Sequence, residues 1–74
     1  IEFYQQSLTI AKEIGDRQGE ANSLGSLGIA YRSLGQYQKA IEFYQQSLTI
    51  AKEIGDRQGE ANSLGSLGIA YRSL

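Results

Sequence analysis

Residues 1–34 read IEFYQQSLTIAKEIGDRQGEANSLGSLGIAYRSL, and residues 41–74 repeat the same 34 letters without a change. Only residues 35–40, GQYQKA, separate the two copies, so the period is 40 residues. Recurrence at a fixed period of about 20 to 50 residues is the signature of a solenoid, in which each repeat buries its apolar face against its neighbours. Because 74 residues plus one further six-residue bridge make two periods, we expect the chain to begin and end inside a repeat of a longer array.

Glycines spaced 20 residues apart divide the chain into helices. Gly15, Gly35 and Gly55 each follow an apolar residue that closes a helical pattern, as a left-handed C-terminal cap does. Asp16 and Asp56 follow two of these glycines and suit the N-cap position. Between the glycines, apolar residues recur at steps of three and four, which indicates amphipathic helices and an all-α fold. The four helices are expected near residues 1–14, 16–34, 36–54 and 56–74.

The expected helices are of two kinds. Helix B (1–14 and 36–54) is apolar over a wide arc and should be contacted from two sides, whereas helix A (16–34 and 56–74) carries three glycines in each copy. An interior glycine costs about 0.5–1 kcal/mol relative to alanine, so we interpret Gly28, within the apolar stripe, as a point where another helix must come close. The expected core stripes are Ala21, Leu24, Leu27, Gly28, Tyr31 and Leu34, then Tyr37, Ala40, Ile41, Tyr44, Leu48 and Ala51, with Phe43, Ile50 and Ile54 beside them.

These helices define the expected organisation of the chain. Residues 1–15 should be helix B of a partial repeat, residues 16–55 a complete repeat, and residues 56–74 helix A of a second partial repeat. One end would then expose the apolar face of an unpartnered helix B, and the other end that of an unpartnered helix A.

A known pattern runs through these helices. The spacing of Leu24, Leu27–Gly28, Tyr31, Gly35, Tyr37, Ala40 and Tyr44 resembles the tetratricopeptide repeat. Such repeats usually span 34 residues and close with a proline, whereas this chain has Lys52 at that place and a 40-residue period, which resembles the longer variant of Pins-type adaptors and bacterial repeat proteins. The resemblance implies antiparallel helix pairs coiled into a right-handed superhelix, with helix A lining a concave groove and helix B outside. It also implies a non-catalytic role in holding protein or peptide partners.

The resemblance further implies which residues line the groove. Arginine can bind a carboxylate with two hydrogen bonds, and an asparagine amide can pair with an extended peptide backbone. Pins-type repeats tend to carry Asn where this chain has Ser26 and Ile29, so the groove has few polar side chains that could bind a peptide. Arg32 and Arg72 also have an alternative interpretation, as ordinary solvated or ion-paired side chains. The expected groove residues are Asn22, Gly25, Ile29, Arg32 and Ser33, with Asn62, Gly65, Ile69, Arg72 and Ser73 in the second copy.

Composition argues against several other functions. The chain has no cysteine and no histidine, and its seven basic and eight acidic residues are dispersed, so we expect no catalysis, no metal, no cofactor, and no grip on nucleic acid or membrane. The five tyrosines lie at helical spacing and are expected to pack in the core with their hydroxyl groups at its rim rather than to stack on bases. We expect a cytoplasmic location.

Two functions are compatible with this pattern. The first is an interaction scaffold whose concave groove binds a peptide or protein segment. The alternative is a structural repeat, consensus-like or designed, that stacks head-to-tail into a continuous superhelix without a dedicated ligand. Identity between the copies makes every surface between repeats self-complementary, and a groove tuned to one peptide would be expected to vary from repeat to repeat.

Overall fold

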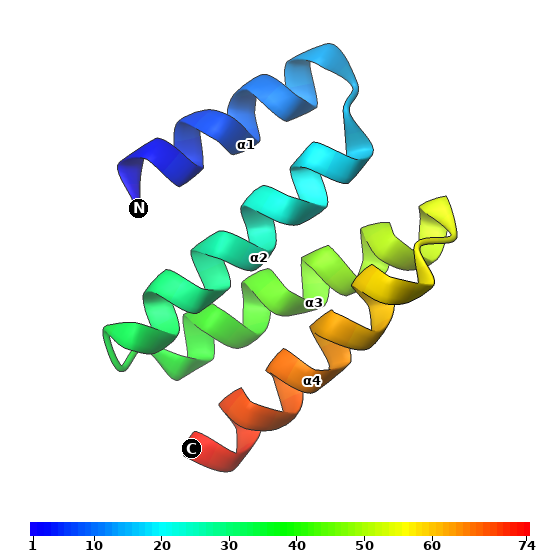
Figure 1. Ribbon diagram of the computed structural model, residues 1–74. Helices are drawn as coiled ribbons and strands as arrows, with labels where there is room; N and C mark the ends of the chain where they lie inside the picture. Colours follow the sequence, from blue (N-terminus) through cyan, green and yellow to red (C-terminus); the bar gives the residue numbers. More distant parts are fainter.

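The computed structural model describes all 74 residues, which form four α-helices and no strand. Every helix end lies within one residue of its expected position, and the all-α class is confirmed. Successive helices run in opposite directions and pack side by side, with the first and the last at opposite ends of the row (Figure 1). The helices are α1 (Glu2–Ile14), α2 (Arg17–Ser33), α3 (Tyr37–Ile54) and α4 (Arg57–Ser73).

The expected caps set the helix boundaries. Gly15, Gly35 and Gly55 have φ angles of 72°, 78° and 71°, the left-handed conformation that glycine adopts at least cost. At the next helix starts, the Asp16 carboxylate accepts a hydrogen bond from the Gly19 backbone N–H at 2.9 Å, and Asp56 accepts one from Gly59 at 3.0 Å. These bonds satisfy backbone donors that would otherwise lack a partner.

The main core lies around α3. As expected for a helix B, α3 packs against two helices, α2 and α4, whereas α1 packs mainly against α2 and buries only Ala11. Burying apolar surface is the main source of stability in such a fold, so the centre of the row is better supported than its ends. The main cluster consists of Leu27, Tyr31, Ala40, Ile41, Tyr44, Leu67 and Ala70.

Gly28 lies where a side chain of α3 packs directly on the backbone of α2. A Cβ atom placed on Gly28 would lie 2.5 Å from Cε1 of Tyr44, which is too short for any real contact. The Tyr44 ring therefore occupies the space that a side chain on α2 would fill. The equivalent residue of the second copy, Gly68, has no such neighbour within 4 Å.

Some core expectations are wrong. Leu34 is 60% exposed because it is the C-cap residue, after the last turn of α2, and Ile54 is exposed at the corresponding end of α3. The Tyr44 hydroxyl group is not at the rim of the core; it is buried and has no hydrogen-bond partner. The missing side chain at Gly28 lets this ring slide far enough inward to bury its polar end.

Candidate functional site

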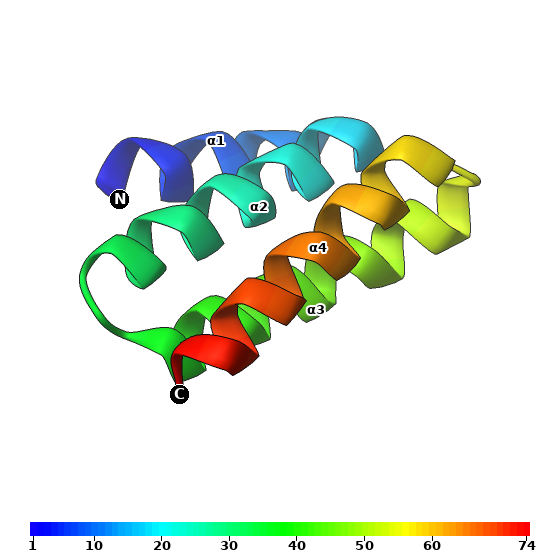
Figure 2. The same ribbon diagram turned by 60° about the horizontal axis from the view of Figure 1, so that its bottom comes forward.

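A hollow of about 370 Å³ lies between α2 and α4, with α3 as its floor. Figure 2 shows α2 and α4 on the same side of the molecule, with α1 and α3 behind them. The lining residues are mostly small or polar. They are Gln18, Ala21, Asn22, Gly25, Ser26 and Ile29 from α2, Tyr44, Ser47 and Ala51 from α3, and Asp56, Gly59, Asn62, Ser63 and Ser66 from the segment that caps and forms α4.

Two buried serines build the floor of this hollow. The Ser47 hydroxyl donates a hydrogen bond to the Ala21 carbonyl oxygen at 3.0 Å. The Ser63 hydroxyl in turn donates to the Ser47 hydroxyl oxygen at 3.5 Å. Buried hydroxyl groups are tolerated when they find such partners. These bonds tie α3 to α2 and α4 and leave a floor of small side chains, on which an incoming main chain could lie close to the helices.

An asparagine stands on each wall of the hollow. Asn22 on α2 and Asn62 on α4 are exposed, and each is approached by a glutamine one turn earlier. The Gln18 amide donates to Asn22 Oδ1 at 3.5 Å, and the Gln58 amide donates to Asn62 Oδ1 at 3.4 Å. The oxygen of each asparagine accepts from a glutamine, and its NH₂ group donates to no other residue of the chain, so it can donate to a ligand.

A polar link joins the two walls near the start of the helices. The Gln18 amide donates to Asp56 Oδ2 at 3.2 Å across the hollow. The pKa of Asp56 is lowered, first by the hydrogen bond from the Gly59 backbone N–H and then by Gln18, since both stabilise the ionised carboxylate. Asp56 is therefore an ionised N-cap of α4 that also links α4 to α2, and both of its hydrogen-bond donors come from this chain.

Four of the ten expected groove residues line the hollow: Asn22, Gly25, Ile29 and Asn62. The other six lie outside it: Arg32, Ser33, Gly65, Ile69, Arg72 and Ser73. The hollow ends before the last turn of α2, so Arg32 and Ser33 lie beyond it. The other four residues lie on α4, and a further helix beside α4 would be needed to form an opposite wall for them.

Neither groove arginine forms an ion pair. Arg72 is exposed, whereas Arg32 is partly buried and its charge acts on the Tyr44 phenol. Burial raises the pKa of Tyr44 because the phenolate would lose hydration, and Arg32 partly opposes this rise. Both guanidinium groups are therefore free of carboxylates within this chain.

Several lining residues were not among the expected groove residues, among them Gln18 on α2, Ser47 on α3, and Ser63 and Ser66 on α4. Ser47 was the detectable member, because it lies on the face that also carries Ala40, Tyr44 and Ala51, where every other residue is apolar. A lone polar residue on a buried helix face indicates either a local hydrogen-bond network or a hollow beside that face. Gln18 and Ser66 carried no comparable signal, because polar residues at exposed helix positions are ordinary.

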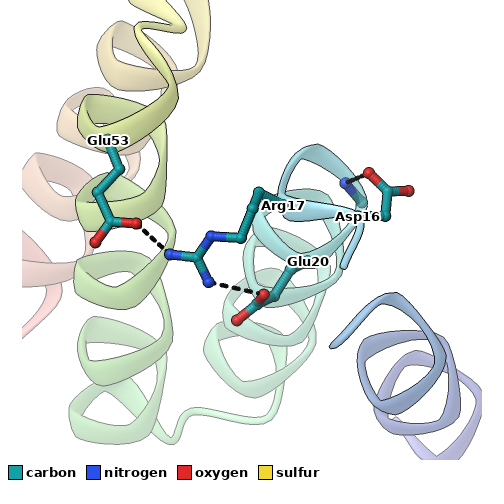
Figure 3. Close-up of polar contacts among 5 residues, drawn as sticks. Asp16, Arg17, Glu20 and Glu53 are labelled. Atoms are coloured by element: carbon teal, nitrogen blue, oxygen red, sulfur yellow. Dashed lines mark hydrogen bonds and ion pairs between the residues drawn. The ribbon is translucent and has the colours of Figure 1, made fainter. Parts of the chain in front are cut away.

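An ion-pair cluster lies outside the hollow and joins α2 to α3. Arg17 pairs with Glu20 on its own helix at 3.0 Å and with Glu53 on α3, next to the Asp16 cap (Figure 3). In the second copy, Arg57 reaches only Glu60, at 3.5 Å. No group of three acidic side chains gathers where a metal ion could bind, and none of the helices has the length and hydrophobicity to cross a bilayer.

The row of antiparallel hairpins with a hollow between alternate helices defines a helical-repeat protein of the α-solenoid class. A sequence profile of the tetratricopeptide repeat matches residues 1–53, and the chain belongs to that family. G-protein-signaling modulator 1 of Homo sapiens is 40% identical over 40 residues, which are 54% of this chain and 6% of that protein. The chain thus corresponds to a small part of this relative. The family points to a role as a scaffold for protein–protein interaction.

Proposed function

We propose that the chain is a scaffold module whose hollow between α2 and α4 holds an extended segment of a partner protein. The observation that carries the proposal is the pair of exposed asparagines, Asn22 and Asn62, on facing walls with their oxygens already engaged. Their NH₂ groups can donate to main-chain carbonyl oxygens of an extended chain, which has no internal partners for them. The small floor residues let that chain approach closely.

The lining also indicates which segment would fit. Serine, glycine and alanine dominate the surface, and the exposed Ile29 is its main apolar contact. A segment with small or polar side chains and free carbonyl groups suits this hollow better than one with large hydrophobic anchors. Carboxylates further along the same segment would suit Arg32 and Arg72, which have no ion-pair partners in the chain.

The remaining expectations belong to the same proposal. The groove would extend from the hollow along the last turns of the helices A, to Ser33, Gly65, Ile69 and Ser73. Residues 16–55 would act as one complete repeat, flanked by the partial repeats 1–15 and 56–74. The role requires neither catalysis nor a cofactor, and it involves neither nucleic acid nor membrane. A cytoplasmic location stays a prediction.

A peptide selection tests this function. A phage library of random 12-residue peptides is selected on the immobilised protein, and the affinity of a selected peptide is measured by fluorescence polarisation. The double variant Asn22→Ala/Asn62→Ala should bind the peptide about tenfold or more weakly, because each lost hydrogen bond is worth about 1 kcal/mol. Arg32→Ala should weaken only those peptides that carry carboxylates.

The matched control is Gln46→Ala, an exposed position of α3 that does not line the hollow. It should leave affinity unchanged. The proposal fails if no peptide is enriched, or if the asparagine variant and the Gln46→Ala control bind the selected peptides equally well.

A second candidate function is structural: repeats of this kind would stack head-to-tail into a continuous superhelix. The observation behind it is the identity of residues 1–34 and 41–74, which makes the surfaces between repeats self-complementary. This candidate does not compete with the groove, because the two use different faces of the helices.

A further inference from the structure

One polar group on the floor of the hollow has no partner. Tyr44 lines the hollow from α3 and is 2% exposed, and its hydroxyl group is buried without a hydrogen bond. The two buried serines of the same floor, Ser47 and Ser63, are both paired. An unpaired buried polar group costs free energy, and a native structure rarely keeps one without a reason. The Tyr44 hydroxyl therefore marks a place where a hydrogen bond can be gained on binding.

The contacts of the Tyr44 ring place its hydroxyl group near Arg32. A Cβ atom placed on Gly28 of α2 would lie 3.0 Å from Cζ of Tyr44, the carbon that carries the hydroxyl group. Arg32 follows one helical turn after Gly28 and so lies on the same face of α2. It is partly buried, forms no ion pair, and its positive charge acts on the Tyr44 phenol. Two groups that can donate hydrogen bonds thus lie near each other without a carboxylate of this chain.

The two ends of the hollow differ in charge. Asp56 lies at the end where α2 and α4 begin, and its lowered pKa keeps it ionised. Arg32 lies toward the opposite end, in the last turn of α2. A segment that lies along the hollow therefore meets a negative charge at one end and a positive charge at the other.

We infer that the Arg32 end of the hollow is a carboxylate subsite, in which the Arg32 guanidinium and the Tyr44 hydroxyl donate to one carboxylate of the bound segment. This inference rests on the proposed function, because it names the chemical group by which the segment is held and oriented. The carboxylate belongs to an acidic side chain or to the C-terminus of the segment.

A carboxylate suits this pair of donors better than other groups do. Its oxygens can accept from the guanidinium and from the hydroxyl group at the same time. Burial raises the pKa of Tyr44, so the phenol keeps its proton and acts as a donor. One guanidinium balances the single charge of a carboxylate, whereas a phosphate carries nearly two charges and usually binds to a cluster of arginines.

Binding at this subsite requires a side chain to shift. The Tyr44 hydroxyl group has almost no accessible surface in the free chain. Arg32 can move, since its side chain is long, partly exposed and not held by an ion pair. The incoming carboxylate draws the guanidinium toward itself and gives the hydroxyl group its missing partner.

The subsite also sets the direction of the segment. Asn22 and Arg32 lie on the same helix about 15 Å apart along its axis, which four or five extended residues span. The carboxylate therefore lies about four or five residues from the carbonyl group that accepts from Asn22. The reversed placement would bring the carboxylate to Asp56, where like charges repel.

An NMR titration with three synthetic peptides tests the inference. All are acetylated hexapeptides of alternating serine and glycine. The first ends in a free carboxylate, the second ends in an amide, and the third has glutamate in its last position and also ends in an amide. At least one of the two acidic peptides should bind about fivefold or more tightly than the neutral one, because hydrogen bonds between charged groups are the stronger ones. The tighter of the two identifies the source of the carboxylate.

Two variants separate the contributions of the donors. Tyr44→Phe and Arg32→Gln should each remove most of the preference for a carboxylate and leave the affinity for the neutral peptide unchanged. Tyr44→Phe should resist urea at least as well as the parent, because it removes a buried hydroxyl group that has no partner. The matched controls are Tyr37→Phe, outside the hollow, and Arg72→Gln, whose charge does not act on the Tyr44 phenol. Both controls should keep the full preference.

A spin label tests the direction. The unique residues 35–40 follow directly after the Arg32 end of α2, so their amide signals report on that end. A nitroxide on a cysteine in the fifth position of the tighter acidic peptide should broaden these signals. The same label in the first position should leave them sharp.

Three results would overturn the inference. They are equal affinities of the neutral and acidic peptides, a carboxylate preference that survives Tyr44→Phe or Arg32→Gln, and stronger broadening of residues 35–40 from the first position. Equal affinities that still fall in Asn22→Ala/Asn62→Ala would remove the subsite alone and leave the proposed function standing. Failure of all three peptides to bind would count against both.

Discussion

The two identical segments, residues 1–34 and 41–74, have different structural roles. In the first, the helix-A face of α2 is sealed by α3; in the second, the same face on α4 is open, so Leu24 is buried and Leu64 is not. The helix-B segments differ in the opposite sense, since Tyr44 is buried and Tyr4 is half exposed. Local sequence therefore determines the helix, while the neighbouring helix decides whether a given residue is buried or exposed.

The same contrast extends to polar residues. Arg17 bridges two helices, whereas Arg57 has only a longer contact within its own helix. The Ser47 hydroxyl bonds to the backbone of α2, whereas Ser7 is exposed. Each pair of equivalent residues is thus a built-in control, in which one substitution is compared with the same substitution in a different environment.

The largest difference is expected between Leu24→Ala and Leu64→Ala. Truncating the buried Leu24 should lower the free energy of unfolding by about 2–5 kcal/mol, since it removes apolar contacts and leaves a cavity. The same change at the half-exposed Leu64 should cost less than about 1 kcal/mol in dilute protein. Thermal and urea unfolding followed by circular dichroism measure both values. Equal losses would show that the end helices are packed as tightly as the centre.

A smaller difference is expected between Ser47→Ala and Ser7→Ala. Both changes remove one hydroxyl group from a helix and so share the same change in helix propensity. Only Ser47→Ala also removes the hydrogen bond to the Ala21 carbonyl, which should lower the free energy of unfolding by about 1 kcal/mol relative to Ser7→Ala. Urea unfolding of the two variants provides the comparison, and identical midpoints would contradict the assigned bond.

The smallest effect concerns the pH dependence of the Asp56 cap. Its pKa is lower in the folded chain than in the unfolded chain, so its contribution to stability is present above the unfolded value and is lost as the pH falls through the folded one. Carboxyl carbon NMR should give a midpoint below the ordinary value of 3.8. In Gln18→Ala the midpoint should rise only partway, since the Gly59 N–H still donates. A midpoint unchanged by Gln18→Ala would show that Gln18 does not donate a hydrogen bond to Asp56, and so that this bond does not link α2 to α4.

Much of the fold could be predicted because its signals are local. The glycine caps and the Asp16 and Asp56 N-caps follow from residue type and spacing, and so does tight packing at Gly28, although the structure fills that place with the Tyr44 side chain. What sequence alone could not separate is Gly28 from Gly68, since their surroundings in the sequence are the same. Only the presence or absence of a packed neighbour distinguishes them.

The candidate site was less predictable, for a related reason. Asn22 and Asn62 could be placed on a common helix face, but the floor of the hollow comes from α3 and depends on how the three helices pack. The buried Tyr44 hydroxyl follows from the depth to which that ring enters at Gly28, which no periodicity in the sequence encodes.

Amide hydrogen exchange measured by NMR in dilute protein tests most directly whether neighbours, rather than sequence, set local stability. Because the segments are identical, assignments are anchored on the unique residues 35–40, which adjoin α2 and α3. The amides of Leu24 and Ile50 should exchange about tenfold or more slowly than those of Leu64 and Ile10, because the end helices open without unfolding the centre. Equal protection within each pair would contradict the account.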